Sequence, residues 1–256
     1  MKTVNDPQNR VKTMTTVFTI VESLQRSDGV RISELAAELD LAKSTVHRHL
    51  STLEELEYVV KEGDVYYLGL RFIGLGEFVR NRKLAFRLAR DKVADLAEET
   101  EERAQFIAEE HGLGVCVHRS IGKRAVKADL EVGKRVPLHA TASGKAILAH
   151  LPDRKRDRIL TRRGLESYTD NTYTNQSELE SHLDEIRDSG VAINEQEHIR
   201  GLKAIGVPVM GPDGDVLGAI SVSGPAHRMK GTWLEDTLPS LLLGTANELE
   251  LNIVYS

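Results

Sequence analysis

The sequence predicts an α+β protein with two domains. Three helical patterns followed by two short strand patterns occupy the first 72 residues, and strand and helix patterns alternate over much of the remainder. A hairpin around the turn at 211–215 requires that at least part of the larger sheet is antiparallel. The 256 residues, 40% of them hydrophobic, can bury one sizeable core or two smaller ones.

The N-terminal domain is expected to begin with three helices. The first is predicted over 11–24, where apolar residues recur at helical spacing until a Ser-Asp-Gly run ends it. Ser33 is the expected N-cap of a short second helix over 34–39. A turn over 40–42 leads into the third helix, 43–56. Two helices joined by so short a turn, with a third packed on them, form a helix-turn-helix.

A β-hairpin is expected directly after the third helix. Two β-rich runs, 58–61 and 65–68, are separated by Glu-Gly-Asp, which favours a tight turn. Its position makes the domain a winged helix-turn-helix, which we expect to span 1–72. A long helical pattern without proline follows, so the second domain, 73–256, should begin with a linker helix and a first helix of its own.

The second domain should combine short strands with helices. Its expected elements are strands over 105–109, 114–118, 206–210 and 216–223, a further strand suggested within 123–130, and helices over 144–151, 179–189 and 234–251.

The outward face of the third helix favours contact with DNA. When Val46, Leu50 and Leu53 face the core, the opposite face carries small hydroxyl and basic side chains, whereas a merely solvated helix prefers Glu and Lys. Small hydroxyls allow close approach to the major groove, and arginine can bind guanine through two hydrogen bonds. The residues expected to contact DNA are Ser33, Lys43, Ser44, Thr45, His47, Arg48 and Ser51.

The charge of this domain argues for dimerisation. Residues 1–75 contain nine Lys and Arg and eleven Asp and Glu, a formal charge of -2, and Glu62 and Asp64 stand at the tip of the expected wing. Phosphate binding depends on Lys and Arg, so one copy should bind DNA weakly. We expect two copies to bind two half-sites about one turn of DNA, or a multiple of it, apart.

Two segments of the second domain could together form a small polar pocket. Ala142, Ser143 and Gly144 begin a helix, where free N–H groups and the helix dipole favour an anion. Ser221 and Ser223 share one face of a strand, although serines on a strand are more often ordinary surface residues. Together the two segments could bind a carboxylate without a buried cation.

Four motifs carry a resemblance to a known family. "LAKSTVHRHLSTLEELEYV", "PLHATASGKAILA", "EQEHIRGLKAIGVPV" and "GDVLGAISVSGP" occur in the order and spacing of the IclR family of one-component transcriptional regulators, which the chain resembles over nearly its whole length. The resemblance implies a GAF-like effector domain with a central antiparallel sheet, a homodimer or a tetramer built from dimers, and a double-stranded DNA operator. It also implies control of a catabolic operon by a small organic carboxylate. The implied effector site comprises Ala142, Ser143, Asn194, Ala204, Ser221 and Ser223.

The chain departs from the family pattern at two of these positions. Some members have an acidic side chain in place of Asn194 and a thiol in place of Ala204. The pocket should therefore be less negative and offer one polar contact fewer. We expect a ligand that is bulkier or more apolar than a keto acid of two or three carbons.

Other classes of protein are disfavoured by the sequence. The single cysteine, Cys116, excludes a disulfide framework and a zinc cluster built from cysteines. The start of the chain lacks a hydrophobic leader, and no apolar run approaches the length of a membrane span, so we expect a cytoplasmic protein. Nine histidines are scattered, apart from His47 and His49, so neither a metal site nor a cofactor is expected.

Two alternative functions remain to be weighed. A hydrolytic enzyme could use Glu195 with Glu197, or Cys116 with His118 or His139, but no activating context is evident for either set, and we expect no enzyme. A ligand-binding module acting through protein partners is favoured only by the acidic wing. The sequence leaves open the effector, the operator, the choice between activation and repression, and that between dimer and tetramer.

Overall fold

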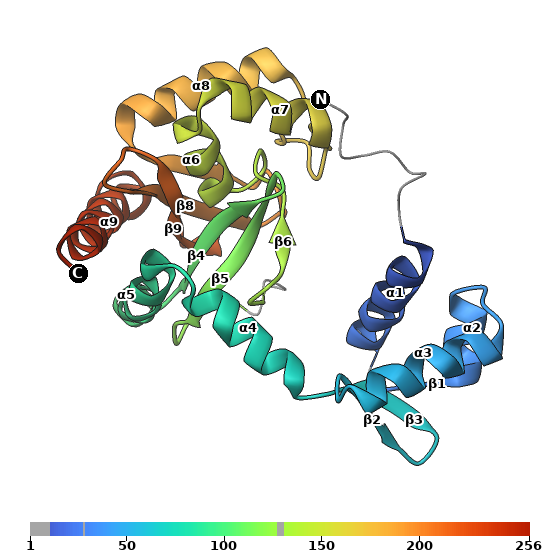
Figure 1. Cartoon of the computed structure of the whole chain (residues 1–256). Helices are drawn as coiled ribbons and strands as arrows, with labels where there is room; N and C mark the ends of the chain where they lie inside the picture. The colour runs from blue at the N-terminus through green and yellow to red at the C-terminus, as the bar shows by residue number, and fades with distance from the viewer. Residues whose placement is uncertain (1–10, 28, 127–130) are drawn as a thin grey trace. The chain divides into compact units, whose positions relative to one another are not determined.

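The computed structural model describes residues 11–27, 29–126 and 131–256, and the chain separates into two compact units (Figure 1). The first unit extends to Val79 and the second comprises Arg80–Ser256. The division falls within α4 (Arg71–Asn81), which therefore connects the units along the chain. None of the described helices is both long and apolar enough to cross a membrane.

The first unit is a winged helix-turn-helix, as predicted. Its elements before α4 are α1 (Lys12–Arg26), β1 (Val30–Arg31), α2 (Ile32–Glu38), α3 (Lys43–Glu55), β2 (Val59–Glu62) and β3 (Val65–Leu68). The strands form an antiparallel sheet in the order β1-β3-β2. The core combines Ile20, Leu35, Val46, Leu50 and Tyr66, one or two from each helix and one from β3. Helical periodicity was sufficient to predict this arrangement.

Ser33 is not the N-cap of α2, contrary to expectation. The helix begins at Ile32, and Arg31 stands at the N-cap with its backbone N–H donating to Oε2 of Glu34 at 2.9 Å. The physical reason is that Val30–Arg31 form β1, which pairs with β3. The chain therefore passes directly from a strand into the helix, and Ser33 lies exposed in its first turn.

The second unit is built on a six-stranded antiparallel sheet. The strands are β4 (Arg103–Glu110), β5 (Leu113–Ile121), β6 (Arg135–Val136), β7 (Ala192–Glu195), β8 (Leu202–Met210) and β9 (Val216–Pro225). Their order across the sheet is β6-β5-β4-β9-β8-β7, and every neighbouring pair is antiparallel. The predicted α+β class and central antiparallel sheet are confirmed.

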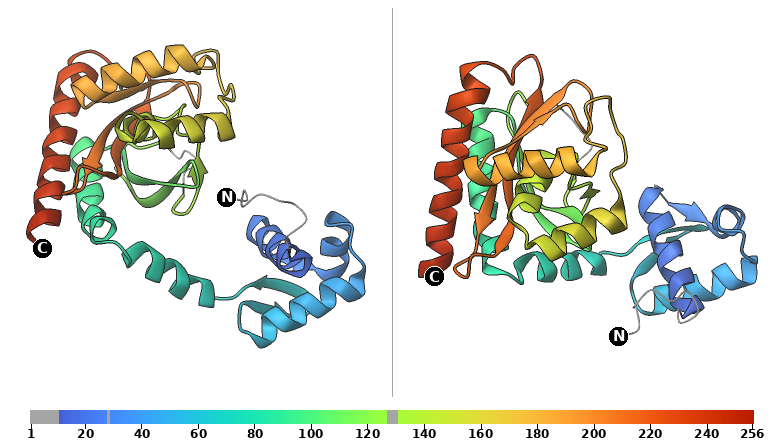
Figure 2. Two further views of the ribbon diagram at one scale, coloured as in Figure 1. Left: turned by 45° about the horizontal axis from the view of Figure 1, so that its top comes forward. Right: turned by 90° about the horizontal axis from the view of Figure 1, so that it is seen from above.

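Helices cover both faces of this sheet. The helices are α5 (Leu84–Thr100), α6 (Ala142–His150), α7 (Asp153–Arg163), α8 (Gln176–Ser189) and α9 (Leu238–Tyr255), the last preceded by a π-helical turn at Trp233–Thr237. Figure 2 shows α5 and α9 on one face and α6, α7 and α8 on the other. Each layer has its own hydrophobic core, and alternate residues along β4 contribute to the two: Phe106 packs with α5 and α9, and Ile107 packs with α6.

Several elements differ from those predicted. The strand suggested within 123–130 is not formed over 123–126, and the rest of that range lies outside the described residues. Pro152 does end α6, but it also stands at the N-cap of α7, which the sequence did not predict because Ile159 and Leu160 are its only buried residues. The acid in its first turn and the arginines in its last turn complement the helix dipole.

Candidate functional site

The face of α3 expected to contact DNA is exposed. Lys43, Ser44, His47 and Arg48 are accessible to solvent, and Thr45 and Ser51 are half-buried at the edges of this face. The opposite face is in the core, where Val46 and Leu50 are fully buried. The residues available for a groove are therefore distinct from those that hold the helix in place.

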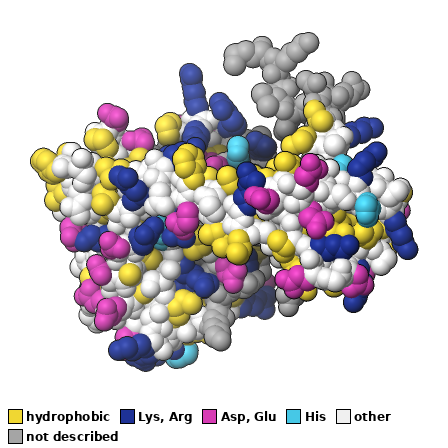
Figure 3. Space-filling model, turned by 60° about the horizontal axis from the view of Figure 1, so that its bottom comes forward, with side chains coloured by type: hydrophobic (Ala, Val, Ile, Leu, Met, Phe, Trp, Pro, Cys, Tyr) yellow, Lys and Arg dark blue, Asp and Glu magenta, His cyan; other side chains and the backbone are white. Residues whose placement is uncertain are grey.

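The tip of the wing is acidic, as its sequence indicates, and one of its acids is engaged. Nε of Arg31 donates to Oδ2 of Asp64 at 2.7 Å, and this hydrogen bond holds the pKa of the Asp64 carboxyl below its usual range. On the face drawn in Figure 3, basic and acidic side chains are interspersed. Base-reading residues on α3 are thus supplied without a strongly basic surround.

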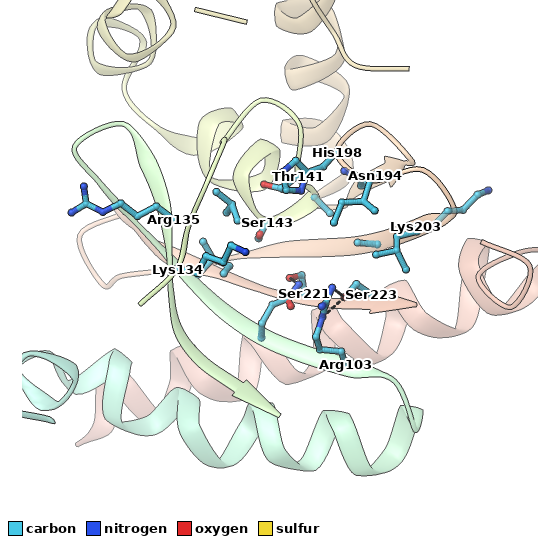
Figure 4. Close-up of a pocket in the computed structure, with 17 residues that line it drawn as sticks. Arg103, Lys134, Arg135, Thr141, Ser143, Asn194, His198, Lys203, Ser221 and Ser223 are labelled. Carbon is cyan, nitrogen blue, oxygen red and sulfur yellow. Dashed lines mark hydrogen bonds between the residues drawn. The ribbon is translucent and has the colours of Figure 1, made fainter. Parts of the chain in front are cut away.

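The second unit contains a cavity of about 310 Å³ between the sheet and the N-terminus of α6 (Figure 4). All six residues expected at an effector site line it: Ala142, Ser143, Asn194, Ala204, Ser221 and Ser223. In Figure 4, Ser143 lies on one side of the cavity and Ser221 and Ser223 on the other. The two segments that the sequence suggested as halves of a pocket are therefore brought together.

Strand register sets the order of residues on the cavity floor. Arg103 pairs with Ser223, Ser223 with Ala204, and Ala204 with Asn194, so these four form a single row across β4, β9, β8 and β7. A second row, two residues along each strand, pairs Gln105 with Ser221 and Ser221 with Gly206. Because side chains alternate between faces, both rows point to the side covered by α6.

The N-terminus of α6 lies directly over the second row. A Cβ atom at Gly206 would come within 2.7 Å of the Ser143 nitrogen, so only glycine allows the helix to approach this closely. Thr141 caps the helix and its Oγ1 accepts from the Gly144 N–H at 3.2 Å. The first-turn N–H groups of Ala142 and Ser143, which have no acceptor within the helix, remain to bind an anion.

Arg103 and Gln105 line the cavity, and sequence reasoning missed both. Nε and Nη2 of Arg103 donate to Oγ of Ser223 at 3.0 and 2.9 Å, and Nε2 of Gln105 donates to Oγ of Ser221 at 2.8 Å. Burial lowers the pKa of the Arg103 guanidinium. The pocket does contain a buried cation, whereas the sequence had suggested that none was needed. The strand begins two residues earlier than predicted, and alternate polar residues from Arg103 were the available signal.

Asn194 is held by the protein itself. Its Nδ2 donates to the carbonyl of Ala140, and its Oδ1 accepts from the N–H of Glu197 at 3.2 Å. The amide thus ties β7 to the segment that precedes α6. A bound molecule has access to the second N–H of this amide only.

A buried ion pair fixes the segment after β7 against α6. Nζ of Lys145 lies 2.6 Å from Oε1 of Glu197 and donates to the carbonyl of Ile193 at 2.7 Å, and both charged side chains are almost fully buried. Burial lowers the pKa of Lys145, while the Glu197 carboxylate opposes that shift. Glu195 in turn pairs with Lys203 at 2.6 Å. The two glutamates considered for acid/base chemistry are therefore partners of lysines.

Cys116 is equally unsuited to act as a nucleophile. Burial raises the pKa of its thiol to about 11. Nε2 of His118 donates to the carbonyl of Phe86 at 2.6 Å, and Nε2 of His139 donates to that of Glu166 at 2.9 Å. Among the described residues, no group of three or more His, Cys, Asp or Glu side chains could hold a metal ion.

Comparison with known proteins gives matches over both units. The model of the IclR helix-turn-helix domain matches residues 16–63, and that of the bacterial transcriptional regulator IclR C-terminal domain matches residues 79–250. The probable HTH-type transcriptional regulator ArcR of Halobacterium salinarum is 30% identical over 253 residues, which cover 97% of this chain and 96% of that relative.

Solved structures agree with these matches. The Thermotoga maritima IclR has a TM-score of 0.82 at 27% identity and covers 95% of this chain and 99% of its own. The inducer-binding domain of the Acinetobacter PobR transcription factor, a double mutant in complex with 3-hydroxybenzoic acid, has a TM-score of 0.59 at 27% identity and covers 64% of this chain and 96% of its own. Since these relatives are transcriptional regulators and not enzymes, and since both units match, the chain belongs to the IclR family of DNA-binding transcriptional regulators.

Proposed function

We propose that the chain regulates a catabolic operon in the cytoplasm in response to a small organic carboxylate. The observation that carries the proposal is the cavity, in which two first-turn N–H groups of α6 face two serine hydroxyls across the sheet. A buried carboxylate requires donors, and this arrangement supplies them. The effector would place its carboxylate at Ala142 and Ser143 and its remaining polar group near Ser221 or Ser223.

DNA reading is assigned to the exposed face of α3, together with Ser33 of α2. Arg48 would make base contacts, and Lys43 and the hydroxyls would contact phosphates and base edges. Effector binding would alter operator affinity by favouring one of two states of the assembly, which requires different effector affinities for the two.

The assembly is proposed to be a homodimer or a tetramer built from dimers. α4 contains no buried residue, and its apolar side chains are exposed, with Ile73 at 61% and Phe78 at 73%. Such a contiguous apolar surface usually marks an interaction site. A second copy of α4 would cover it and bring two reading helices to one operator.

Replacement of Phe78 by glutamate should therefore shift the protein toward monomer, because the charge would be desolvated in the interface. Light scattering after size-exclusion chromatography measures the mass. Tyr255→Glu, at an 84% exposed position of α9, is the matched control and should leave the mass unchanged. A Phe78→Glu protein with the wild-type mass would contradict the role of α4.

Mobility-shift assays with the DNA upstream of the protein's own gene test the regulatory proposal. Absence of a specific shift would favour the alternative, a ligand-binding module that acts through protein partners. Thermal-shift screening of sugar acids, aromatic acids and keto acids tests the pocket, with the Ser221→Ala, Ser223→Ala double variant as comparison. An acid that stabilises both proteins equally, yet changes operator affinity, would place the effector elsewhere.

A further inference from the structure

The floor of the cavity carries a second anion-binding feature, distinct from the N-terminus of α6. Ser223 Oγ accepts two N–H donors from Arg103, at 3.0 and 2.9 Å, which occupies both of its lone pairs. The hydroxyl can therefore act toward a ligand only as a donor. The group of the effector that meets Ser223 must be an acceptor.

The charge behind this hydroxyl favours an ionised acceptor. Arg103 is 7% exposed, and a buried guanidinium strengthens the donor that it polarises. Among the described residues that line the cavity, four are Lys or Arg and none is Asp or Glu. Two of the four, Arg135 and Lys203, have carboxylate partners outside the lining, Glu110 at 3.7 Å and Glu195 at 2.6 Å. Arg103 therefore dominates at the floor.

The two anion-binding features are separated along the sheet. The N-terminus of α6 lies over the row of Gly206 and Ser221, and Ser223 stands two residues farther along β9. At about 3.3 Å per residue, the separation is roughly 7 Å. A cavity of about 310 Å³ has room for a molecule that spans it.

We propose that the effector is a dicarboxylic acid, with one carboxylate at the Ala142 and Ser143 amides and the other at Ser223, backed by Arg103. This deepens the proposed function and rests on it. Arg103 acts as a positioning residue, because it fixes the Ser223 hydroxyl as a donor and supplies the charge that an anionic acceptor needs. An uncharged acceptor at the same place gains less.

Matched pairs of ligands test the proposal directly. Succinate is compared with succinamate, glutarate with glutaramate, and terephthalate with 4-carbamoylbenzoate, because each pair differs only in the exchange of one carboxylate for an amide. Titration calorimetry on the full-length wild type should show a preference for one diacid over its monoamide of about tenfold, the difference between a charged and a neutral hydrogen bond. Arg103→Gln should abolish this preference, and Arg103→Lys should restore part of it.

Arg135→Gln is the matched control, because it removes a cation from the same lining at an exposed position and should leave the preference intact. Equal affinity of wild type for both members of every pair overturns the proposal without any variant. So does a preference that persists in a folded Arg103→Gln protein, with folding checked by its circular dichroism. If a monocarboxylate from the broader screen binds and no diacid does, the dicarboxylate proposal fails while the effector pocket stands; if no acid binds at all, both fail.

Discussion

The exposed face of α3 and the cavity over β4 and β9 use polar side chains in opposite ways. On α3, Arg48 and its neighbours extend into solvent, and no Asp or Glu is recorded as an ion-pair partner of Arg48 among the described residues. In the cavity, Arg103 and Asn194 are buried and already bonded within the protein. The first region is built to be completed by a partner, and the second is largely formed before a ligand arrives. Substitutions should therefore affect binding in the first region and folding as well as binding in the second.

The largest effect that this comparison predicts is the loss of Lys145. Lys145→Met should lower the free energy of unfolding by about 3 to 5 kcal/mol, because it leaves the Glu197 carboxylate buried without its partner. Urea denaturation measures the loss. Lys203→Met, which breaks a pair with the half-exposed Glu195, should cost less than about 1 kcal/mol. A Lys145→Met, Glu197→Met double variant should recover much of the stability, and failure to do so would contradict the ion-pair explanation.

Arg48→Ala should have the opposite character. It should weaken specific operator binding by about 1 to 3 kcal/mol per half-site, because a two-hydrogen-bond contact to a base is lost, while stability remains unchanged. Fluorescence anisotropy at fixed salt measures the affinity. Arg26→Ala, at an exposed arginine that pairs with Glu38 on α2, is the matched control. Wild-type affinity in Arg48→Ala would remove this face of α3 from DNA reading.

The smallest predicted effect is the pH response of Cys116. Its thiol has a pKa of about 11 in the folded protein, against 9.0 as the ordinary value, so the unfolded chain releases this proton first. The thiol's contribution to stability is complete below pH 9 and is lost as pH rises from 9 to 11, with about 1 kcal/mol gone at pH 10. Comparing wild type with Cys116→Ala by denaturant unfolding at pH 8 and 10 isolates this contribution. Equal pH dependence in the two proteins would refute it.

The two regions also differ in how far the sequence could predict them. The face of α3 follows from a single helix, because residues three and four apart share a side, and the position of Val46 and Leu50 in the core implies the exposure of Arg48. The expected N-cap at Ser33 was wrong because it depended on a strand of two residues, which is too short to produce a periodic pattern. Local patterns thus predict helices better than the short pairings between them.

The cavity depends on contacts between distant segments. Ser221 and Ser223 share a face because of strand periodicity alone, so that part was predictable. That Arg103 lies beside Ser223, 120 residues away in sequence, is decided by which strands become neighbours. Periodicity within one strand contains no information on that choice. The resemblance to a family supplied the six expected lining residues, and it did not supply the residues of β4.

Gly206 has a consequence for how new specificities arise in such a pocket. Because the helix N-terminus meets the sheet at a position without a side chain, the two amides of Ala142 and Ser143 are fixed by main-chain geometry alone. The row of Arg103, Ser223, Ala204 and Asn194 can therefore vary while the carboxylate anchor stays in place. A lineage that acquires a different nutrient acid can retune its regulator by point substitutions along that row, keeping the same general grip on acids throughout.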